Sequence, residues 1–382
     1  MMIKRTIHEI SRCLRLLPGY CGVSSFSPRD FLVSTAPASL ISVLFIMMFF
    51  VPSPEALPTH LDMTKLKGKC SECHKGHGTR GTTNLAGSKD DLCFKCHGFS
   101  GKASDIYSEL TKLSNHKILE TSRYHVPGEE LPEKDPSAPR HASCYDCHNV
   151  HKSEKSDLLK GLRGYSGKGF SAKQTSRQYE LCYSCHSDSA NLRAEALNIS
   201  LAFDSSNPSF HPVEAYGKRA SLPSIRNSGL SRMIDCTDCH GNDNPAGPKG
   251  PHGSRFAPIL KYQYIRTAGA ENTRSYELCY SCHERSSILG DESFKAHKIH
   301  VVFNRISCAQ CHDAHGSRFY PSLVRFDTTT VFPNSNGEMT FQPMSAGKPR
   351  CYLSCHVNGQ VYEHKLDKNL VYTINTRLLN QW

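Results

Sequence analysis

The 382-residue sequence has little of what builds an ordinary apolar core: hydrophobic residues make up 38% of it, and Trp382 is its one tryptophan. It also lacks a long hydrophobic run. The longest run, Leu40–Val51, covers twelve mostly apolar residues, whereas a membrane-spanning helix needs about 20. No Gly-rich phosphate loop, Ser/His/Asp constellation or pair of catalytic carboxylates stands out. The sequence therefore offers no nucleotide-dependent or hydrolytic site, and no catalytic residue is predicted.

The apolar run has the length of the central part of a secretory signal peptide. Basic residues precede it and the small Ala56 follows it, so residues 1–56 are predicted to be a leader that is cleaved near Ala56. An uncleaved membrane anchor is the alternative. Cys13 and Cys21 lie in this leader and would be absent from the exported chain.

Cysteine, in contrast, is abundant, and 16 of the 18 cysteines fall in eight short motifs. Seven motifs read Cys-x-x-Cys-His and the last reads Cys-x-x-x-Cys-His. This sequence attaches c-type haem: the two thiols bond to the porphyrin and the histidine binds the iron. We therefore predict eight covalently attached c-type haems. The motif residues are Cys70, Cys73 and His74; Cys93, Cys96 and His97; Cys144, Cys147 and His148; Cys182, Cys185 and His186; Cys236, Cys239 and His240; Cys279, Cys282 and His283; Cys308, Cys311 and His312; and Cys351, Cys355 and His356.

Two other uses of cysteine compete with haem. Disulfides suit an exported protein, but eight such short loops would join nothing distant. Zinc is the stronger competitor, because Cys73 and Cys93 are separated by 19 residues, as in a four-cysteine zinc ribbon. The corresponding separations in the later pairs of motifs are 34, 39 and 39 residues, and zinc does not explain a histidine after every second cysteine.

Haem also accounts for the thin apolar composition, since each porphyrin is a large apolar plate. The predicted fold is mostly irregular coil with short α-helices packed around eight covalent haems, with little β-structure. The formal charge is +11, of which the leader holds five basic and three acidic residues, leaving 11 − 2 = +9. The haems bring two propionates each, so the basic residues balance the cofactors. Lys and Arg are scattered along the chain, and no nucleic-acid partner is predicted.

The motifs alternate between two forms, which indicates duplication. Odd-numbered motifs are followed by another histidine, and even-numbered ones read LCxxCH or a variant of it. YELCYSCH occurs at 179–186 and 276–283, and HGSRF at 252–256 and 315–319. We predict a leader, 1–56, and four dihaem units, 57–114, 115–200, 201–287 and 288–382. Pro127–Pro139 is predicted to be a linker, Gly161–Gly169 and Gly241–Gly253 are predicted to be loops, and Val371–Thr376 a short strand.

Each iron also needs a sixth ligand, and twelve histidines outside the motifs and the leader are available for eight positions. Methionine is scarce and out of step with the motifs. We expect the histidines that trail odd motifs to bind the second haem of their own pair, and preceding histidines to bind the first. His116 or His141 is an alternative to His125, and His297 to His300, whereas His364 is not expected to be a ligand. The trailing set is His77, His151, His252 and His315, and the preceding set is His60, His125, His211 and His300.

The paired CxxCH-xx-H-G and LCxxCH units, spread over residues 60–356, resemble the doubled-CXXCH multihaem cytochromes c of respiratory, often metal-reducing, bacteria. The resemblance implies a chain of low-potential haems with two axial histidines that passes electrons in or beyond the periplasm. Such a protein would be periplasmic, or lie at the outer-membrane surface or outside the cell. Its partners would be other cytochromes, an outer-membrane conduit or further copies of itself.

Two alternative functions remain at this stage. An octahaem enzyme acting on small nitrogen or sulfur oxyanions would need one haem with an open axial position. The Cys-x-x-Cys-Lys motif that marks such a haem is absent, and the surplus of histidines lets every iron be filled. A subunit of an extracellular cytochrome filament would differ from a carrier only in its self-assembly.

Overall fold

A computed structural model describes residues 60–61, 69–76, 84–87, 89–119, 142–154, 157, 159–165, 170–187, 192, 197–218, 222–226, 232–342, 350–357, 360–364 and 373–374. Side chains are not described at 69, 89, 163–165, 170–174, 356–357, 360 and 373–374. The chain divides into Met1–Ala56 and Leu57–Trp382, and every described residue belongs to the second unit. The predicted leader and the Pro127–Pro139 linker lie outside the described residues.

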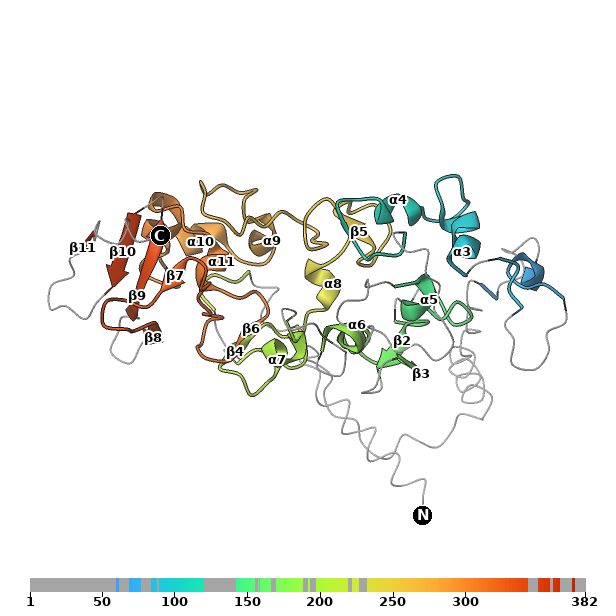
Figure 1. Ribbon diagram of the computed structural model, residues 1–382, viewed down its shortest axis with the longest axis horizontal. Coiled ribbons are helices and arrows are strands. Elements are labelled where there is room, and N and C mark those ends of the chain that lie inside the picture. The colour runs from blue at the N-terminus through green and yellow to red at the C-terminus, as the bar shows by residue number, and fades with distance from the viewer. Residues whose placement is uncertain are drawn as a thin grey trace, which may run out of the picture. The chain divides into compact units, whose positions relative to one another are not determined.

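Short helices joined by coil dominate the described residues (Figure 1). The two longest α-helices, α3 (Lys89–His97) and α6 (Gln178–His186), have nine residues each. The other helical segments are η2 (Lys69–Glu72, a 3₁₀ turn), α4 (Tyr107–Leu110), α5 (Cys144–Cys147), α7 (Ile199–Phe203), α8 (Cys236–Cys239), α9 (Glu277–Tyr280), α10 (Arg285–Leu289), η3 (Lys298–Phe303, a π-helix) and α11 (Cys308–Cys311). None of the helices in the described part of the chain is long and apolar enough to cross a membrane.

The strands are short except near the C-terminus. Two antiparallel ladders of two residues per strand join distant segments, β1 with β5 and β4 with β6, and β2 pairs with β3. A five-stranded sheet has the order β11-β10-β9-β7, and β8 also pairs with β9. The strands are β1 (Ser114–Asn115), β2 (Arg163–Tyr165), β3 (Phe170–Gln174), β4 (Ser209–Phe210), β5 (Gly253–Ser254), β6 (Gly316–Ser317), β7 (Val331–Phe332), β8 (Thr340–Gln342), β9 (Arg350–Val357), β10 (Gln360–His364) and β11 (Thr373–Ile374).

Two sequence expectations about loops need comment. The Gly161–Gly169 stretch is not only a loop, because β2 lies within it and pairs with β3; glycine is tolerated in a two-stranded ribbon whose strands lack a second neighbour. Gly241–Gly253 is irregular, as predicted, apart from its last residue, which begins β5. The predicted strand near the C-terminus is present as β11 within Val371–Thr376.

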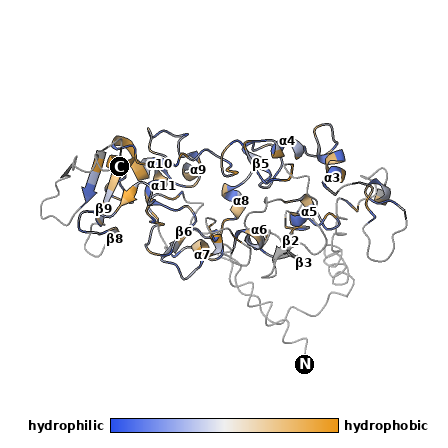
Figure 2. Cartoon of the chain, in the orientation of Figure 1, coloured by the Kyte–Doolittle hydropathy of each residue, from blue (hydrophilic) through white to orange (hydrophobic). Residues whose placement is uncertain are grey.

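The buried apolar side chains form three small clusters, and each one packs against motif cysteines. The first, around Val331 and Leu353, contacts Cys311 and Cys351. The second and third contain Tyr183 and Tyr276 and contact Cys236 in one case, and Cys279 and Cys308 in the other. Figure 2 shows this distribution, with hydrophobic residues interspersed among polar ones except around α10, α11 and β9. The protein's own core is thus divided around the places where the cofactors would be attached.

Candidate haem-binding sites

Odd-numbered motifs each form one helical turn. The amide of the motif histidine donates to the carbonyl of the first cysteine, at 2.9–3.0 Å in all four. In the last three, a capping box satisfies the free amides at the start of the turn, which fixes where the turn begins. The boxes join Ser143 with Asp146, Asp235 with Asp238, and Ser307 with Gln310.

The segment that follows each odd motif turns back and pairs with the motif histidine. An isolated antiparallel bridge joins that histidine to a downstream Leu or Val, and the residue before this partner has a left-handed backbone. The same local fold therefore recurs at four places, which explains why the sequence around the odd motifs repeats. The bridges are His74–Leu85, His148–Leu162, His240–Leu260 and His312–Val324, and the left-handed residues are Asn84, Gly161, Ile259 and Leu323.

Even-numbered motifs are built differently. The second and fourth motifs end the longer helices α3 and α6, and the sixth lies on the turn that begins with α9. The His283 amide again donates to the Cys279 carbonyl, at 2.9 Å. The eighth motif departs from all of these, because Cys351, Cys355 and His356 lie on strand β9.

Histidine rings face one another in pairs across the described chain. The ring centroids of seven pairs are 6.0–6.3 Å apart. Six pairs join a motif histidine to a histidine outside the motifs. The pairs are His74–His151, His97–His60, His148–His252, His240–His315, His283–His211, His312–His297 and His300–His364.

This separation fits one metal ion between two imidazoles. An imidazole nitrogen bonds a first-row metal at about 2.0–2.1 Å, and the ring centre lies about 1.1 Å behind that nitrogen, so two rings on opposite sides have centroids roughly 6.3 Å apart. The spacing therefore matches the two axial ligands of a haem iron.

The hydrogen bonds of the histidine rings also support metal binding. Nδ1 of His240 lies 2.9 Å from the Pro258 carbonyl oxygen, and Nδ1 of His312 lies 2.9 Å from that of Ser322. A proton on Nδ1 leaves the Nε2 lone pair free for a metal, and such a bond orients ligating histidines in metalloproteins. The same contact to a carbonyl oxygen is made by His97, His116, His211 and His300.

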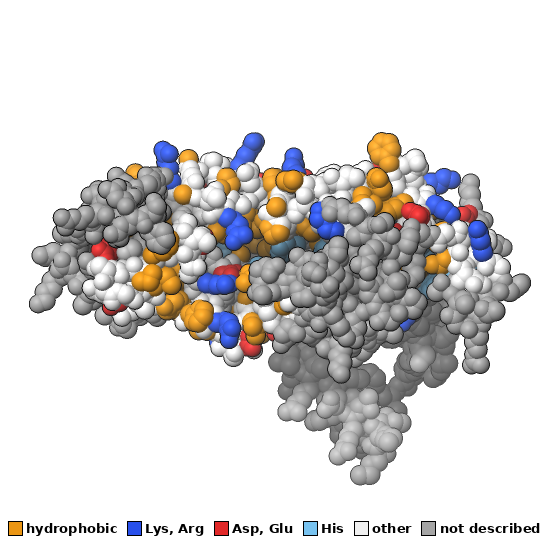
Figure 3. Space-filling view, viewed as in Figure 1, with side chains coloured by type: hydrophobic (Ala, Val, Ile, Leu, Met, Phe, Trp, Pro, Cys, Tyr) orange, Lys and Arg blue, Asp and Glu red, His pale blue; other side chains and the backbone are white. Residues whose placement is uncertain are grey.

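The rings are also held in the form that binds iron. Burial lowers the pKa of His252, His283 and His297 to about 4, and metal binding requires the neutral imidazole. Burial likewise lowers the pKa of His186 to about 4, and His116 is the charged neighbour that adds most to this effect. His116 is therefore the candidate partner of His186 at the fourth motif, on electrostatic grounds rather than from a ring contact. Figure 3 shows histidines in hollows between hydrophobic side chains, with Lys and Arg scattered singly over the visible face.

The two short ladders bring histidines of different units together. In β1–β5, Ser114 is paired with Ser254, and the next residues in register are His116 and His252. In β4–β6, Ser209 is paired with Ser317, followed by His211 and His315. His252, His211 and His315 have ring partners at the third, sixth and fifth motifs, and His116 lies near enough to His186 of the fourth motif to lower its pKa. Each ladder therefore brings histidines towards both motifs of one predicted dihaem unit.

The His-Gly-Ser sequence has a physical explanation at each ladder. A Cβ at Gly253 would lie 1.8 Å from the Glu109 carbonyl oxygen, and a Cβ at Gly316 would lie 1.9 Å from that of Ala202. Only glycine lets β5 approach α4, and β6 approach α7, this closely. The serine is fully buried and its hydroxyl donates to the carbonyl of the residue that bridges the motif histidine: Ser254 to Leu260 and Ser317 to Val324, both at 2.6 Å.

Cysteines of consecutive motifs are neighbours. None of the sixteen motif cysteines forms a disulfide. Thiols lie within hydrogen-bonding distance between the second and third, the fourth and fifth, and the sixth and seventh motifs. At each remaining step, the charge of a cysteine in the adjacent motif is one of the causes that raise the pKa of a motif thiol. The hydrogen-bonded pairs are Cys93–Cys144, Cys182–Cys236 and Cys279–Cys308, and the electrostatic neighbours are Cys73 with Cys93, Cys147 with Cys182, Cys239 with Cys282, and Cys311 with Cys351.

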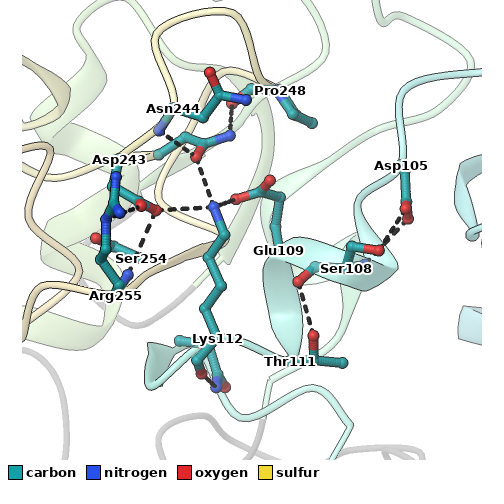
Figure 4. A network of polar contacts seen from close by, with 12 residues as sticks. Asp105, Ser108, Glu109, Thr111, Lys112, Asp243, Asn244, Pro248, Ser254 and Arg255 are labelled. Carbon is teal, nitrogen blue, oxygen red and sulfur yellow. Dashed lines mark hydrogen bonds and ion pairs between the residues drawn. The ribbon is translucent and has the colours of Figure 1, made fainter.

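A polar network holds the first ladder in place (Figure 4). Lys112 donates from Nζ to Glu109, to Asn242 at 2.8 Å and to Asp243 at 2.8 Å. Arg255 adds an ion pair to Asp243 at 2.7 Å. Both acidic side chains are less than a tenth exposed. The network joins α4 to the inserted loop of the third unit, two segments that carry His116 and His252.

Replacing Lys112 with alanine is expected to destabilise the protein by about 3 kcal/mol, because it leaves the buried Glu109 carboxylate without its cation and Asp243 with Arg255 alone. Urea unfolding of the holoprotein measures this change. Lys102→Ala, at an exposed lysine nearby, is the control and should change stability by less than about 0.5 kcal/mol. Equal stability of the two variants would contradict this role of the network.

The same network predicts a pH dependence. Burial raises the pKa of Asp243, but the hydrogen bond and charge of Lys112 outweigh it and hold this pKa below its usual range. A carboxyl group with a lowered folded-state pKa stabilises above its unfolded pKa, and this stability is lost as the pH falls through the folded value. The stability difference between wild type and Lys112→Ala should therefore shrink in acid.

The ring pairs differ from the sequence expectation in which histidines they join. His151, His252 and His315 face the first motif histidine of the preceding unit, not the second of their own. His60 and His211 face the second motif histidine of their unit, not the first.

His77, His125 and His141 lie outside the described residues, and nothing is described of the His356 side chain. Of the alternatives to His125 and His300, His297 faces the motif histidine His312 and His116 is an electrostatic neighbour of His186. His364, which is not expected to be a ligand on sequence grounds, faces His300. A repeat pattern could have identified His116, since Ser-x-His occurs at both 114–116 and 209–211.

Comparison with known proteins agrees with the motifs. The doubled CXXCH motif family matches residues 65–101 and 138–191, and the cytochrome c-type protein NrfB-like family matches residues 236–321. The chain is a multihaem c-type cytochrome. It is similar to the cytochrome c-type protein NrfB of Escherichia coli O6:H1, with 24% identity over 106 residues, which are 28% of this chain and 50% of that protein. The chain thus spans half the length of this curated relative. No solved structure matches.

Proposed function

We propose that this cytochrome is an electron-transfer protein that binds eight c-type haems and passes electrons along them in the order of the motifs. The observation that carries the proposal is the set of histidine pairs with room for one iron between the rings. Haem supplies a one-electron couple at each site. The chain's own residues attach it, fill both of its axial positions and exclude ligands from solvent.

Six of the seven described motif histidine side chains have a histidine ring partner, and His186 has His116 as an electrostatic neighbour. In the proposed assignment, motifs one to seven use His151, His60, His252, His116, His315, His211 and His297 as their sixth ligands. An iron with two protein ligands has no position for a substrate. This favours a carrier over an enzyme that acts on nitrogen or sulfur oxyanions.

The contacts between cysteines of consecutive motifs support the proposed order of electron transfer. Since the thiols become the attachment points of the porphyrins, adjacent thiols place the edges of consecutive haems next to each other. This neighbour relation follows the chain from the first motif to the last. We propose four dihaem units along this line, in a protein exported to the periplasm or the outer-membrane surface, with other cytochromes as donors and acceptors.

Haem counting combined with spin-state spectroscopy tests the proposal. The mature protein should hold eight haems by intact mass and by pyridine haemochrome absorbance. The oxidised protein should give low-spin signals alone, and the reduced protein should bind no carbon monoxide. A stoichiometric high-spin haem in the wild type would instead favour the enzyme. Filaments seen by electron microscopy would favour the extracellular wire subunit.

A further inference from the structure

Asp313 follows the histidine of the seventh motif, but its side chain contacts a histidine ring assigned to another haem. The carboxylate is 13% exposed. Its Oδ1 atom lies 3.1 Å from Nδ1 of the His315 ring and accepts a hydrogen bond from the His315 amide at 2.9 Å. The His315 ring in turn faces His240, with centroids 6.3 Å apart and 3° between the planes. The carboxylate therefore contacts the proposed sixth ligand of the fifth haem.

This partner differs in charge from the partners of other histidine rings. Six rings have Nδ1 next to a backbone carbonyl oxygen, which is neutral, whereas Nδ1 of His315 lies next to a carboxylate. A hydrogen on Nδ1 leaves Nε2 free for iron. A hydrogen bond to an ionised acceptor is about twice as strong as one between neutral groups, and such a bond raises the basicity of a ligating imidazole.

Arg325 holds the Asp313 carboxylate in its ionised form. Its Nη1 atom lies 2.6 Å from Oδ2, so the two carboxylate oxygens have different partners. The Arg325 side chain is 44% exposed, much more than the carboxylate. Water therefore screens the guanidinium more strongly than the carboxylate. The charge of Arg325 thus cancels only part of the field of Asp313 at the His315 ring.

The repeated local fold of the odd motifs shows that this carboxylate belongs to one unit. The amide of the residue after each odd motif histidine donates to the carbonyl of the left-handed residue, at 2.6–3.0 Å in all four units. The four positions therefore correspond, and one of them holds an acid. The residues, in order, are Lys75, Asn149, Gly241 and Asp313. Asn149 shows that an uncharged side chain of the same shape is accommodated at this position.

A carboxylate beside the ligand stabilises the oxidised iron. Ferric haem has one more positive charge than ferrous haem, so a nearby negative charge stabilises it more. The stronger hydrogen bond acts in the same direction, because it makes the imidazole a better donor to the iron, and hydrogen bonds around a haem are one of the means by which a protein sets its potential. Reduction adds one electron to the iron and moves no proton, since Nδ1 keeps its hydrogen in both states.

We propose that Asp313 is a positioning residue for electron transfer, which acts through His315 to lower the reduction potential of the haem at the fifth motif. This assignment rests on the proposed function, in which His315 binds that haem. Electrons that pass from the fourth motif to the sixth then cross a haem that is harder to reduce than it would be with a neutral partner. Arg325 limits the size of this effect.

Asp313→Asn in the holoprotein tests the proposal, because it removes the charge and keeps the shape. In a redox titration followed by visible absorbance, the ratio of ferrous to ferric iron at a fixed potential should rise about tenfold for one haem per chain. This corresponds to a midpoint potential higher by about 59 mV for a one-electron couple. Arg325→Gln keeps the carboxylate and removes its counter-charge, so it should lower the potential of the same haem. Asp204→Asn removes an exposed carboxylate and, as the control, should leave every potential unchanged.

Two further measurements identify the haem and its ligand. In a chain with Cys236→Ala and Cys239→Ala the fifth haem is not attached, and Asp313→Asn should then lose its tenfold effect. Electron paramagnetic resonance of Asp313→Asn should remain low-spin, which shows that His315 still binds. If this variant instead becomes high-spin, the direction of the shift in Arg325→Gln, which retains the carboxylate, decides.

Unchanged potentials in a low-spin Asp313→Asn protein would overturn the proposal. Shifts of the same sign in Asp313→Asn and Arg325→Gln would overturn it as well, because a structural disturbance and not a charge would then be the cause. The wild type separates these failures from failure of the proposed function. Fewer than eight haems, or a stoichiometric high-spin haem, would contradict the proposed function itself.

Discussion

Alanine at Gly316 is expected to disturb two haems at once, those at the fifth and sixth motifs. The added Cβ would lie 1.9 Å from the Ala202 carbonyl oxygen and 3.1 Å from that of Ser209. Both are backbone atoms that cannot rotate away, so β6 must move from α7 and β4. This movement displaces His315 and also His211, whose amide donates to the His315 carbonyl at 3.0 Å. Electron paramagnetic resonance should show two high-spin haems per chain, and two equivalents of carbon monoxide should bind after reduction.

A matched control is available in the same chain. A Cβ added at Gly217 would have no atom within 4 Å, so Gly217→Ala should keep every haem low-spin. Gly253→Ala, which repeats the close contact at Glu109, should disturb the haems at the third and fourth motifs in the same way. Low-spin spectra for both Gly316→Ala and Gly253→Ala would show that the ladders do not hold axial ligands.

The cofactor can be predicted from the sequence because its chemistry needs neighbouring residues. Two thiols and a histidine within five positions are bonded to one porphyrin, so the motif is contiguous and readable. The predominance of coil also follows, since a chain with so few apolar residues relies on its cofactors for a core. The five-stranded sheet around β9 is not expected from the sequence, because CYLSCH resembles the LCxxCH motifs that form helices elsewhere in this chain. The pairing of β9 with β7, β8 and β10 is tertiary and overrides that local similarity.

The ligand partners cannot be predicted in the same way because they are distant in sequence. Proximity along the chain assigns His151 to its own unit, since a turn of three residues leads to it from His148. The structure places it instead next to His74, 77 positions earlier, with nearly parallel rings. The decisive contacts are the ladders, in which two residues per strand join segments more than 100 residues apart. Such ladders are too short to leave a hydrophobic pattern in the sequence.

A second large effect is predicted from the pairing of a histidine of one unit with a motif histidine of the preceding unit. His151→Ala should convert one haem per chain to high spin, and this haem should be the one at the first motif, not the third or the fourth. The reason is the pair of rings of His74 and His151, whose centroids are 6.0 Å apart with 14° between the planes. The first haem would lose its sixth ligand although His151 belongs to the next unit. Carbon monoxide binding, which is expected to be absent in the wild type, should rise to one equivalent.

A double variant identifies which haem is affected. When Cys70 and Cys73 are both replaced by alanine, the first haem is not attached, and His151→Ala should then add no further high-spin signal. The same substitution in a chain with Cys182→Ala and Cys185→Ala should still produce one. The two results together show whether His151 acts through the first haem, because the effects of two substitutions add only when the substituted residues do not act on the same site. If His151→Ala acts only in the first background, His151 serves its own unit, and the proposed linkage of each unit to the next by a histidine is wrong.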